Sequence, residues 1–130
     1  MNILEKIPFH PTQAVVFDID DTLIHSRTHA PIASTARLYK YCRAKGYHIY
    51  IITARPYFPQ NAHITAQQLH QHGFGGYKKI FFRHPNEMRV ALYKQNARKS
   101  IPEKVIMSIG DQPGDFGAYG GVGILVKPDG

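Results

Sequence analysis

Short apolar runs alternate with longer amphipathic segments along the whole chain. The runs are rich in valine, isoleucine and phenylalanine and are bounded by polar residues, a pattern typical of strands buried on both faces. We expect five strands, at residues 14–18, 47–53, 78–82, 104–110 and 121–127. Apolar residues recur at helical spacing in the segments between them. We therefore expect three helices, at residues 31–45, 58–73 and 86–99.

Residues at the borders of these segments indicate where the helices begin and end. Pro31 suits the first turn of the first helix, and Gly46 lies just past its end. Gly73 is expected to end the second helix, and Asn86 to cap the third. The alternation of strands and helices predicts an α/β fold of three layers, with a mainly parallel five-stranded sheet covered by helices on both faces.

Length and composition indicate how many domains the protein has and in which compartment it is found. The chain has 130 residues and 43% hydrophobic content, which is typical of a single domain over residues 1–130 with its own core. The single cysteine, Cys42, excludes an internal disulfide and is expected to be buried. No apolar stretch approaches membrane-spanning length, and the N-terminal segment carries an acid and two prolines where a secretory signal peptide is apolar. We expect an intracellular, cytoplasmic protein without a membrane partner.

The net charge of +7 becomes informative when it is located along the chain. Five of the nine acidic residues fall in two short clusters: Asp18, Asp20 and Asp21, and then Asp111 and Asp115. The other four acids stand against sixteen lysines and arginines, which leaves the rest of the chain at +12. A basic surface around an acidic site suits a polyanionic or phosphorylated partner. Solubility alone is the alternative explanation for this charge.

The acidic clusters coincide with the ends of predicted strands. Asp18 ends the first strand, Thr53 the second and Asp111 the fourth, while Asp20 and Asp115 follow in the adjoining loops. In open α/β sheets the chemistry lies at the carboxyl ends of the strands, so these side chains should converge. Clustered carboxylates repel one another, and a hard cation such as Mg²⁺ allows them to stay ionised together. The sequence therefore predicts a magnesium site.

Four motifs resemble those of the haloacid dehalogenase (HAD) superfamily and follow in the same order along the chain. The first motif, DxDxT, is present as Asp18, Asp20 and Thr22. The later motifs are matched by Thr53 in "IITARP", Lys94 in "YKQNAR", and Asp111 with Asp115 in "GDQPGD". The likeness spans residues 14–126 and is greatest to the HAD acid-phosphatase branch with YKxxxR before a GDQxxD segment.

This resemblance implies a phosphatase mechanism. Asp18 would be the nucleophile, giving an aspartyl-phosphate that water then hydrolyses. Asp20 would protonate the leaving group and later activate water, a role that dehalogenases and phosphate-transferring ATPases of the superfamily do not provide at this position. Thr53 and Lys94 would contact the phosphoryl oxygens, and Ala54 would have to allow the backbone approach that the glycine usual in this branch permits.

The resemblance also implies a metal site and an open architecture. Mg²⁺ would be held by Asp18, Asp111 and the main-chain carbonyl of Asp20, with Asp115 acting through water. The segments between the motifs are too short for a large cap, so we expect a Rossmann-like fold with a minimal cap or none. An open site suits an extended phosphate ester. We expect a Mg²⁺-dependent phosphomonoester hydrolase whose substrate is a phosphorylated nucleic-acid end or a nucleotide.

Two other functions remain compatible with the motifs. A catalytically weak module that binds phosphate or nucleic acid would keep this fold without turnover, although the intact motif residues speak against it. A phosphoacceptor signalling domain also uses an aspartate at a strand end with Mg²⁺, but Asp20 would make its acyl-phosphate short-lived.

Several residues outside the motifs are candidates for roles near the site. Asp21 is expected to be a turn acid that faces solvent. His25 or His29 is a candidate substrate contact at the rim beside Asp20, whereas a zinc site is disfavoured because Pro31 places both histidines in a loop. Four side chains are candidates either for contact with the leaving group or for local packing: Arg55, Tyr57, Phe58 and Arg83.

Overall fold

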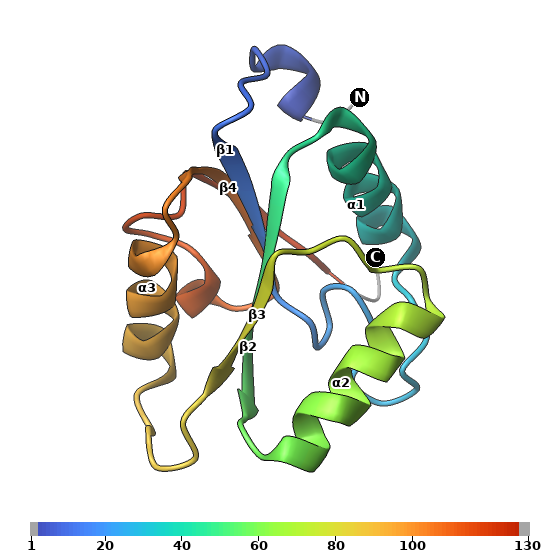
Figure 1. The fold of residues 1–130 in the computed structure, drawn as a ribbon, viewed down its shortest axis with the longest axis vertical. Coiled ribbons are helices and arrows are strands. Elements are labelled where there is room, and N and C mark those ends of the chain that lie inside the picture. The colour runs from blue at the N-terminus through green and yellow to red at the C-terminus, as the bar shows by residue number, and fades with distance from the viewer. Residues whose placement is uncertain (1–2, 128–130) are drawn as a thin grey trace.

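A five-stranded, wholly parallel sheet forms the centre of the protein. The computed structural model describes residues 3–127, and its strands lie in the order β3-β2-β1-β4-β5 (Figure 1). The strands are β1 (Gln13–Phe17), β2 (His48–Pro56), β3 (Lys79–Arg83), β4 (Lys104–Gly110) and β5 (Val122–Leu125). The sheet order places β1 in the middle and β4 beside it, so the two segments that end in acidic motifs are neighbours.

Helices cover both faces of the sheet, which confirms the predicted three-layer α/β fold. They are α1 (Ala33–Lys45), α2 (Pro59–Gln71) and α3 (Val90–Ser100), with short 3₁₀ helices η1 (Ile3–Lys6) and η2 (Pro113–Asp115). Figure 1 shows α1 and α2 on one face and α3 on the other. No cap is evident among residues 3–127.

The central strand is buried on both faces, as its unbroken apolar sequence predicts. Val15 and Phe17 pack into the core cluster beneath α1 and α2, whereas Ala14 and Val16 pack into the cluster beneath α3. Cys42 is fully buried in the first of these clusters, as expected. β1 is thus held from both sides, which fixes the position of the residue that follows it.

Two predicted helix starts are wrong. α1 begins at Ala33, because Pro31 instead forms a bridge with Ile24 in the preceding loop. α3 begins at Val90, and Asn86 is not its cap. The Arg83 side chain donates to the main-chain oxygens of residues 84, 85 and 87, and these bonds hold the segment in a non-helical loop.

β2 is longer than predicted and continues beyond Thr53 to Pro56. Pro56 pairs with Arg83 of β3, and the next amide, that of Tyr57, donates to the Arg83 carbonyl at 2.8 Å. Thr53 therefore lies inside the strand and not at its end. Among the described residues, no helix is both long and apolar enough to cross a membrane.

Candidate active site at the carboxyl edge of the sheet

Asp18 directly follows the central strand and is held by the neighbouring strand. Its amide donates to the carbonyl of Ile109 in β4 at 3.0 Å, so its backbone continues the sheet geometry. The side chain is 6% exposed, and the Thr22 hydroxyl donates to its Oδ2 at 3.2 Å. The carboxylate is therefore fixed and largely buried. It nevertheless lines a pocket that is open to solvent.

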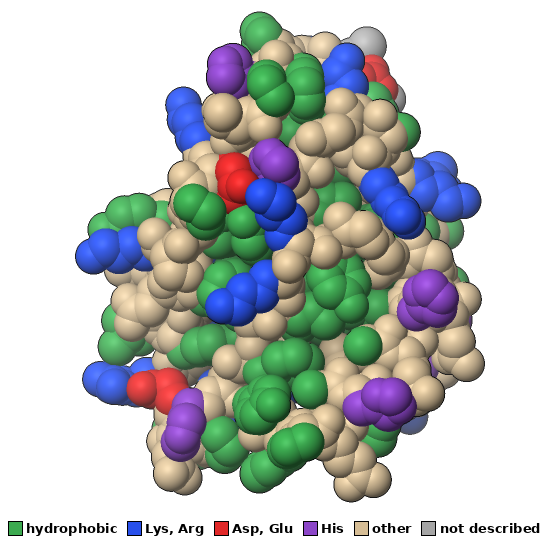
Figure 2. Space-filling view, viewed as in Figure 1, with side chains coloured by type: hydrophobic (Ala, Val, Ile, Leu, Met, Phe, Trp, Pro, Cys, Tyr) green, Lys and Arg blue, Asp and Glu red, His purple; other side chains and the backbone are tan. Residues whose placement is uncertain are grey.

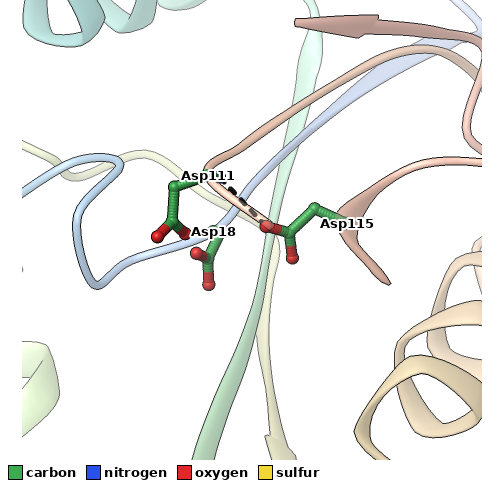
Figure 3. A group of neighbouring side chains, drawn as sticks. All are labelled: Asp18, Asp111 and Asp115. Atoms are coloured by element: carbon green, nitrogen blue, oxygen red, sulfur yellow. Dashed lines mark hydrogen bonds between the residues drawn. The ribbon is translucent and has the colours of Figure 1, made fainter. Parts of the chain in front are cut away.

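Three aspartates converge at this edge, as the motif positions predicted. Asp18, Asp111 and Asp115 point toward one another, and each offers a carboxylate oxygen within 4.8 Å of the others (Figure 3). Lys94 of α3 reaches into the group, and its Nζ donates to Asp18 Oδ1 at 3.1 Å and to Asp115 Oδ1. Asp18 and Lys94, which are 76 residues apart in sequence, thus meet in one cluster, in which Asp18 and Asp115 are buried and Asp111 is partly exposed.

The cluster holds more acid than base. Burial raises the pKa of Asp18 to about 8, against the attraction of Lys94 and with a further upward contribution from Asp115. Burial alone would lower the pKa of Lys94, but the two carboxylates beside it outweigh this effect and raise it. One ammonium thus faces several carboxylates, and the carboxylate oxygens form a hard donor set that suits a divalent cation.

Asp115 is held more tightly than its neighbours. Its Oδ2 accepts hydrogen bonds from the amides of Asp111 and Gln112, at 3.1 and 3.0 Å. Its carboxylate also packs against Gly110, where an added Cβ would overlap it. Glycine at position 110 is therefore required for the observed placement of Asp115, a requirement that the motif pattern alone did not reveal.

Arg98 holds the loop that carries Asp115. It is 3% exposed, and its guanidinium donates to the main-chain oxygens of Gly114, Phe116 and Ala118 at 3.0 to 3.2 Å. It lies one helical turn after Lys94, so one face of α3 delivers both the ammonium and the support for Asp115. Sequence reasoning did not assign Arg98 a role, although the YKxxxR pattern contains it.

Asp20 does not join the three clustered carboxylates. Both of its oxygens accept hydrogen bonds from Arg55, whose Nε and Nη2 donate at 2.9 and 2.8 Å. Arg55 also donates to Thr65 and Gln68 of α2, at 3.0 and 2.8 Å. The arrangement is bidentate and anchored to a helix, so Arg55 orients Asp20 and is not free for a leaving group.

The three residues predicted to contact the phosphate, Thr53, Ala54 and Lys94, differ in their burial and in their hydrogen bonds. Thr53 is fully buried, and its hydroxyl accepts a hydrogen bond from the Arg55 amide at 3.1 Å. Its carbonyl accepts a bond from the Tyr93 hydroxyl at 2.7 Å, which ties β2 to α3. Ala54 and Lys94 line the pocket. Contact of Thr53 with a phosphoryl oxygen stays a prediction.

The family described as HAD superfamily, subfamily IIIB (acid phosphatase) matches residues 23–127. This range includes Lys94, Asp111 and Asp115 and begins just after Asp18 and Asp20. The chain belongs to this HAD family. The predicted resemblance to the HAD superfamily is thereby confirmed.

Solved structures with this HAD fold include two large assemblies, named "Structure of the Pnkp1/Rnl/Hen1 RNA repair complex" and "Structure of Pnkp1/Rnl/Hen1 complex". Both match with a TM-score of 0.73 at 16% identity over 88% of this chain. They are covered over 42% and 46% of their own chains, so this chain spans less than half their length. At this identity the likeness shows the fold alone. None of the curated proteins matches the sequence.

The pocket beside the aspartate cluster is open and has a volume of about 380 Å³. Asp18, Asp20, Ala54 and Lys94 form part of its wall. Asp21 also lines it, but in a turn with φ of 57°, where its carboxylate accepts two hydrogen bonds from Ser26 at 2.9 Å. Asp21 thus serves the turn, as predicted.

The aromatic residues beyond β2 stay outside this pocket. Tyr57 and Phe58 are about half exposed, and the Tyr57 ring packs edge-on against Phe82. Arg83 is committed to main-chain oxygens, including that of Ala54 at 2.9 Å. Tyr57 and Arg83 therefore have local structural contacts, whereas the half-exposed Phe58 ring remains accessible.

Proposed function

We propose that this HAD phosphatase is a Mg²⁺-dependent phosphomonoester hydrolase that forms an aspartyl-phosphate on Asp18 and acts on phosphorylated nucleic-acid ends. The observation that carries the proposal is the convergence of Asp18, Asp111 and Asp115 with Lys94 in an open pocket. A nucleophile, a cation and a set of hard ligands within one pocket are the parts that phosphoryl transfer to a carboxylate needs.

Asp18 is oriented for attack by bonds to both of its oxygens. Thr22 donates to Oδ2 and Lys94 to Oδ1, so the carboxylate has little rotational freedom to lose on reaching the transition state. Lys94 would also contact the phosphoryl oxygens. Its positive charge would stabilise the negative charge of the transferring group at the buried base of the pocket, where Lys94 is 4% exposed.

The three clustered aspartates fit Mg²⁺ because this ion prefers carboxylate oxygens. Asp18, Asp111 and the main-chain carbonyl of Asp20 would hold it, with Asp115 contributing through water. When bound, Mg²⁺ would offset the repulsion between the Asp18 carboxylate and the phosphate. The bonds from Lys94 and from the amides of residues 111 and 112 already occupy Asp115, which supports its indirect role.

Asp20 would act as the general acid and base. Because Arg55 donates to both of its oxygens, one oxygen must be released before Asp20 can carry a proton to the leaving group. Asp20→Asn should therefore slow the hydrolysis of alkyl phosphates more than that of aryl phosphates, whose better leaving group needs less protonation. Equal losses on both substrates would contradict this role.

The preference for an extended anion rests on the surface and on the lack of a cap. Figure 2 shows lysine and arginine side chains scattered over the face viewed, with few acidic ones. An open pocket cannot enclose a small ester, so binding energy must come from parts of the substrate that extend over the rim. The RNA repair complex named in the similar structures supports a nucleic-acid substrate.

An aryl phosphate assay with and without Mg²⁺ tests the chemistry, with Asp18→Asn as the matched inactive control. We expect turnover only with the metal and with Asp18. Binding of phosphorylated ligands without turnover would favour a weak binding module of the same fold. A stable phosphorylated protein without hydrolysis would favour a phosphoacceptor signalling domain. A screen over nucleotides, sugar phosphates, phosphopeptides and phosphorylated oligonucleotides then tests the substrate class.

A further inference from the structure

A second hollow adjoins the catalytic pocket and is larger than it. It has a volume of about 790 Å³, against about 380 Å³ for the pocket, and the two share Asp21, Asp111 and Gln112 in their walls. Residues 25–28 form one side of this hollow and residues 125–127 the other. We call it the flap recess, after the loop of residues 25–28 that forms one side of it. None of the catalytic steps above uses its remaining residues.

Both sides of the flap recess are braced by main-chain bonds. In the loop from β1 to α1, the His25 amide donates to the Ala30 carbonyl at 2.8 Å, and the Ile24 side chain beneath is fully buried. On the other side, the Val126 amide donates to the carbonyl of Gly110 at 2.7 Å. A ligand in the recess would therefore meet walls that are already ordered, which reduces the entropy cost of binding.

The side chains of the flap recess favour an anion. Arg27, Lys127 and His25 line it, and within residues 3–127 the side chains of Arg27 and Lys127 make no hydrogen bond or ion pair. Two acids also line the recess: Asp21 is occupied by the amide and hydroxyl of Ser26, and Asp111 belongs to the aspartate cluster proposed to hold Mg²⁺. Unpaired cations beside a hollow attract a negatively charged group that reaches them.

The opposite rim of the catalytic pocket offers no such cation among the described residues. Val90 and Ala91 line it, and the neighbouring Arg89 is paired with Glu87 through two bonds of 3.0 Å. Met88 beside them is 80% exposed. A substrate with a second negative charge would thus be bound more favourably toward the flap recess than toward this apolar side.

We propose that the flap recess is a subsite for the phosphodiester next to the terminal phosphate of a polynucleotide, with Arg27 as its principal contact. This proposal rests on the proposed function, because it needs the terminal phosphate to lie at Asp18. The planar Arg27 guanidinium can donate two parallel hydrogen bonds to the non-bridging oxygens of a phosphodiester. Lys127 adds positive charge along the path of the chain, and the His25 imidazole offers a further hydrogen-bonding group.

A matched set of three substrates tests the subsite. They are a nucleoside monophosphate, a dinucleotide that adds one phosphodiester, and the same dinucleotide with an uncharged methylphosphonate linkage. We expect kcat/KM to be about tenfold higher for the charged dinucleotide than for either of the others, the gain expected for one charge-assisted contact. Arg27→Gln should remove most of this preference.

A control variant separates a local contact from a general effect of charge. Lys104→Gln removes one exposed positive charge at the start of β4, on the opposite edge of the sheet, and should keep the tenfold preference. If Lys104→Gln lowers the preference as much as Arg27→Gln, the effect is long-range attraction and the subsite is wrong. If the methylphosphonate dinucleotide is as good a substrate as the charged one, the subsite is also wrong.

Binding measured without turnover distinguishes this proposal from the proposed function. In an Asp18→Asn background, fluorescence anisotropy of labelled dinucleotides should show tighter binding of the charged linkage, and Arg27→Gln should abolish the difference. Wild-type enzyme that hydrolyses aryl phosphate but shows no linkage preference overturns the subsite and leaves the phosphatase intact. A linkage preference in binding, with no hydrolysis of any substrate, overturns the phosphatase and supports the subsite.

A phosphopeptide with an acidic residue beside its phosphoserine tests the class of ligand. Its carboxylate offers a second negative charge with a different geometry. We expect Arg27→Gln to lower its kcat/KM less than that of the charged dinucleotide. An equal or greater loss would identify the recess as a general anion site and would overturn the assignment to polynucleotides.

Discussion

Two charged clusters lie at opposite edges of the same sheet, and the pKa values of their acids are shifted in opposite directions. At the carboxyl edge, burial raises the pKa of Asp18 to about 8. At the amino edge, burial alone would raise the pKa of Glu103, but hydrogen bonds from Tyr50 and Lys78 outweigh it and hold it at about 2. Tyr50 and Lys78 donate to separate oxygens of Glu103, at 2.6 and 2.9 Å.

The difference lies in the ratio of acids to donors. Glu103 is a single carboxylate with several donors, and its bonds connect β2, the segment before β3 and the start of β4. Asp18 shares one ammonium with Asp115 and faces Asp111 as well. A cluster whose charges are satisfied within the protein needs no ligand, whereas one with surplus acid is stabilised by a cation from outside. The first arrangement stabilises the fold, and the second is suited to catalysis.

The most severe change at the carboxyl edge is Asp18→Asn. We expect it to reduce kcat on an aryl phosphate by at least about a thousandfold, because the amide cannot act as the nucleophile. Its melting temperature without metal should change little, because asparagine keeps the shape of the aspartate side chain and Lys94 keeps its bond to Asp115. Circular dichroism during heating provides the control for folding. Full activity would contradict a covalent mechanism.

Gly110→Ala tests whether the exact placement of Asp115 matters. The new methyl group would overlap the Asp115 carboxylate and displace it from Lys94, and we expect kcat/KM to fall about a hundredfold. Gly75→Ala is the matched control, because its Cβ would lie 3.6 Å from the Arg43 side chain and meet no closer atom. Normal activity in Gly110→Ala would mean that this edge tolerates a displaced Asp115.

The metal dependence should separate Asp111 from Asp115. Asp111→Ala should raise the Mg²⁺ concentration for half-maximal activity by about tenfold or more, and Asp115→Ala should raise it less, because Asp115 already bonds to Lys94 and two amides. Titration of activity against Mg²⁺ measures both. Saturating Mg²⁺ should also raise the melting temperature of the wild-type protein. Identical titration curves for all three proteins would show that the fourth motif does not hold the metal.

The carboxyl edge was largely predictable from the sequence because its residues follow strands. The apolar runs place Asp18 and Asp111 at strand ends, and parallel pairing brings them together. Their supports were less predictable. Arg55 reaches Asp20 across 35 residues, and nothing in its local sequence indicates that partner. Similarly, the start of α3 was misplaced because the bonds that hold the preceding loop come from a side chain in β3.

The amino edge could not be foreseen at all, since Tyr50 and Glu103 are 53 residues apart and belong to no motif. The hydrogen bonds of Glu103 with Tyr50 and Lys78 follow only from the pairing of the strands. A cluster of this kind depends on register, because a shift of one residue in β2 would turn the Tyr50 side chain to the other face. Sequence patterns therefore identified the site with surplus charge and missed the site with balanced charge.

The smallest expected effect is that of Glu103→Gln, and it completes the comparison. Because the pKa of Glu103 falls from 4.5 to about 2 on folding, its contribution to stability is present above pH 4.5 and is lost as the pH drops toward 2. Wild-type protein should lose stability in this window, and the variant should lose less. At neutral pH the variant should melt about 4 °C lower, equivalent to about 1 kcal/mol, with unchanged kcat/KM on aryl phosphate. Lowered activity with an unchanged melting curve would show that the two edges are coupled and that the amino edge is not merely structural.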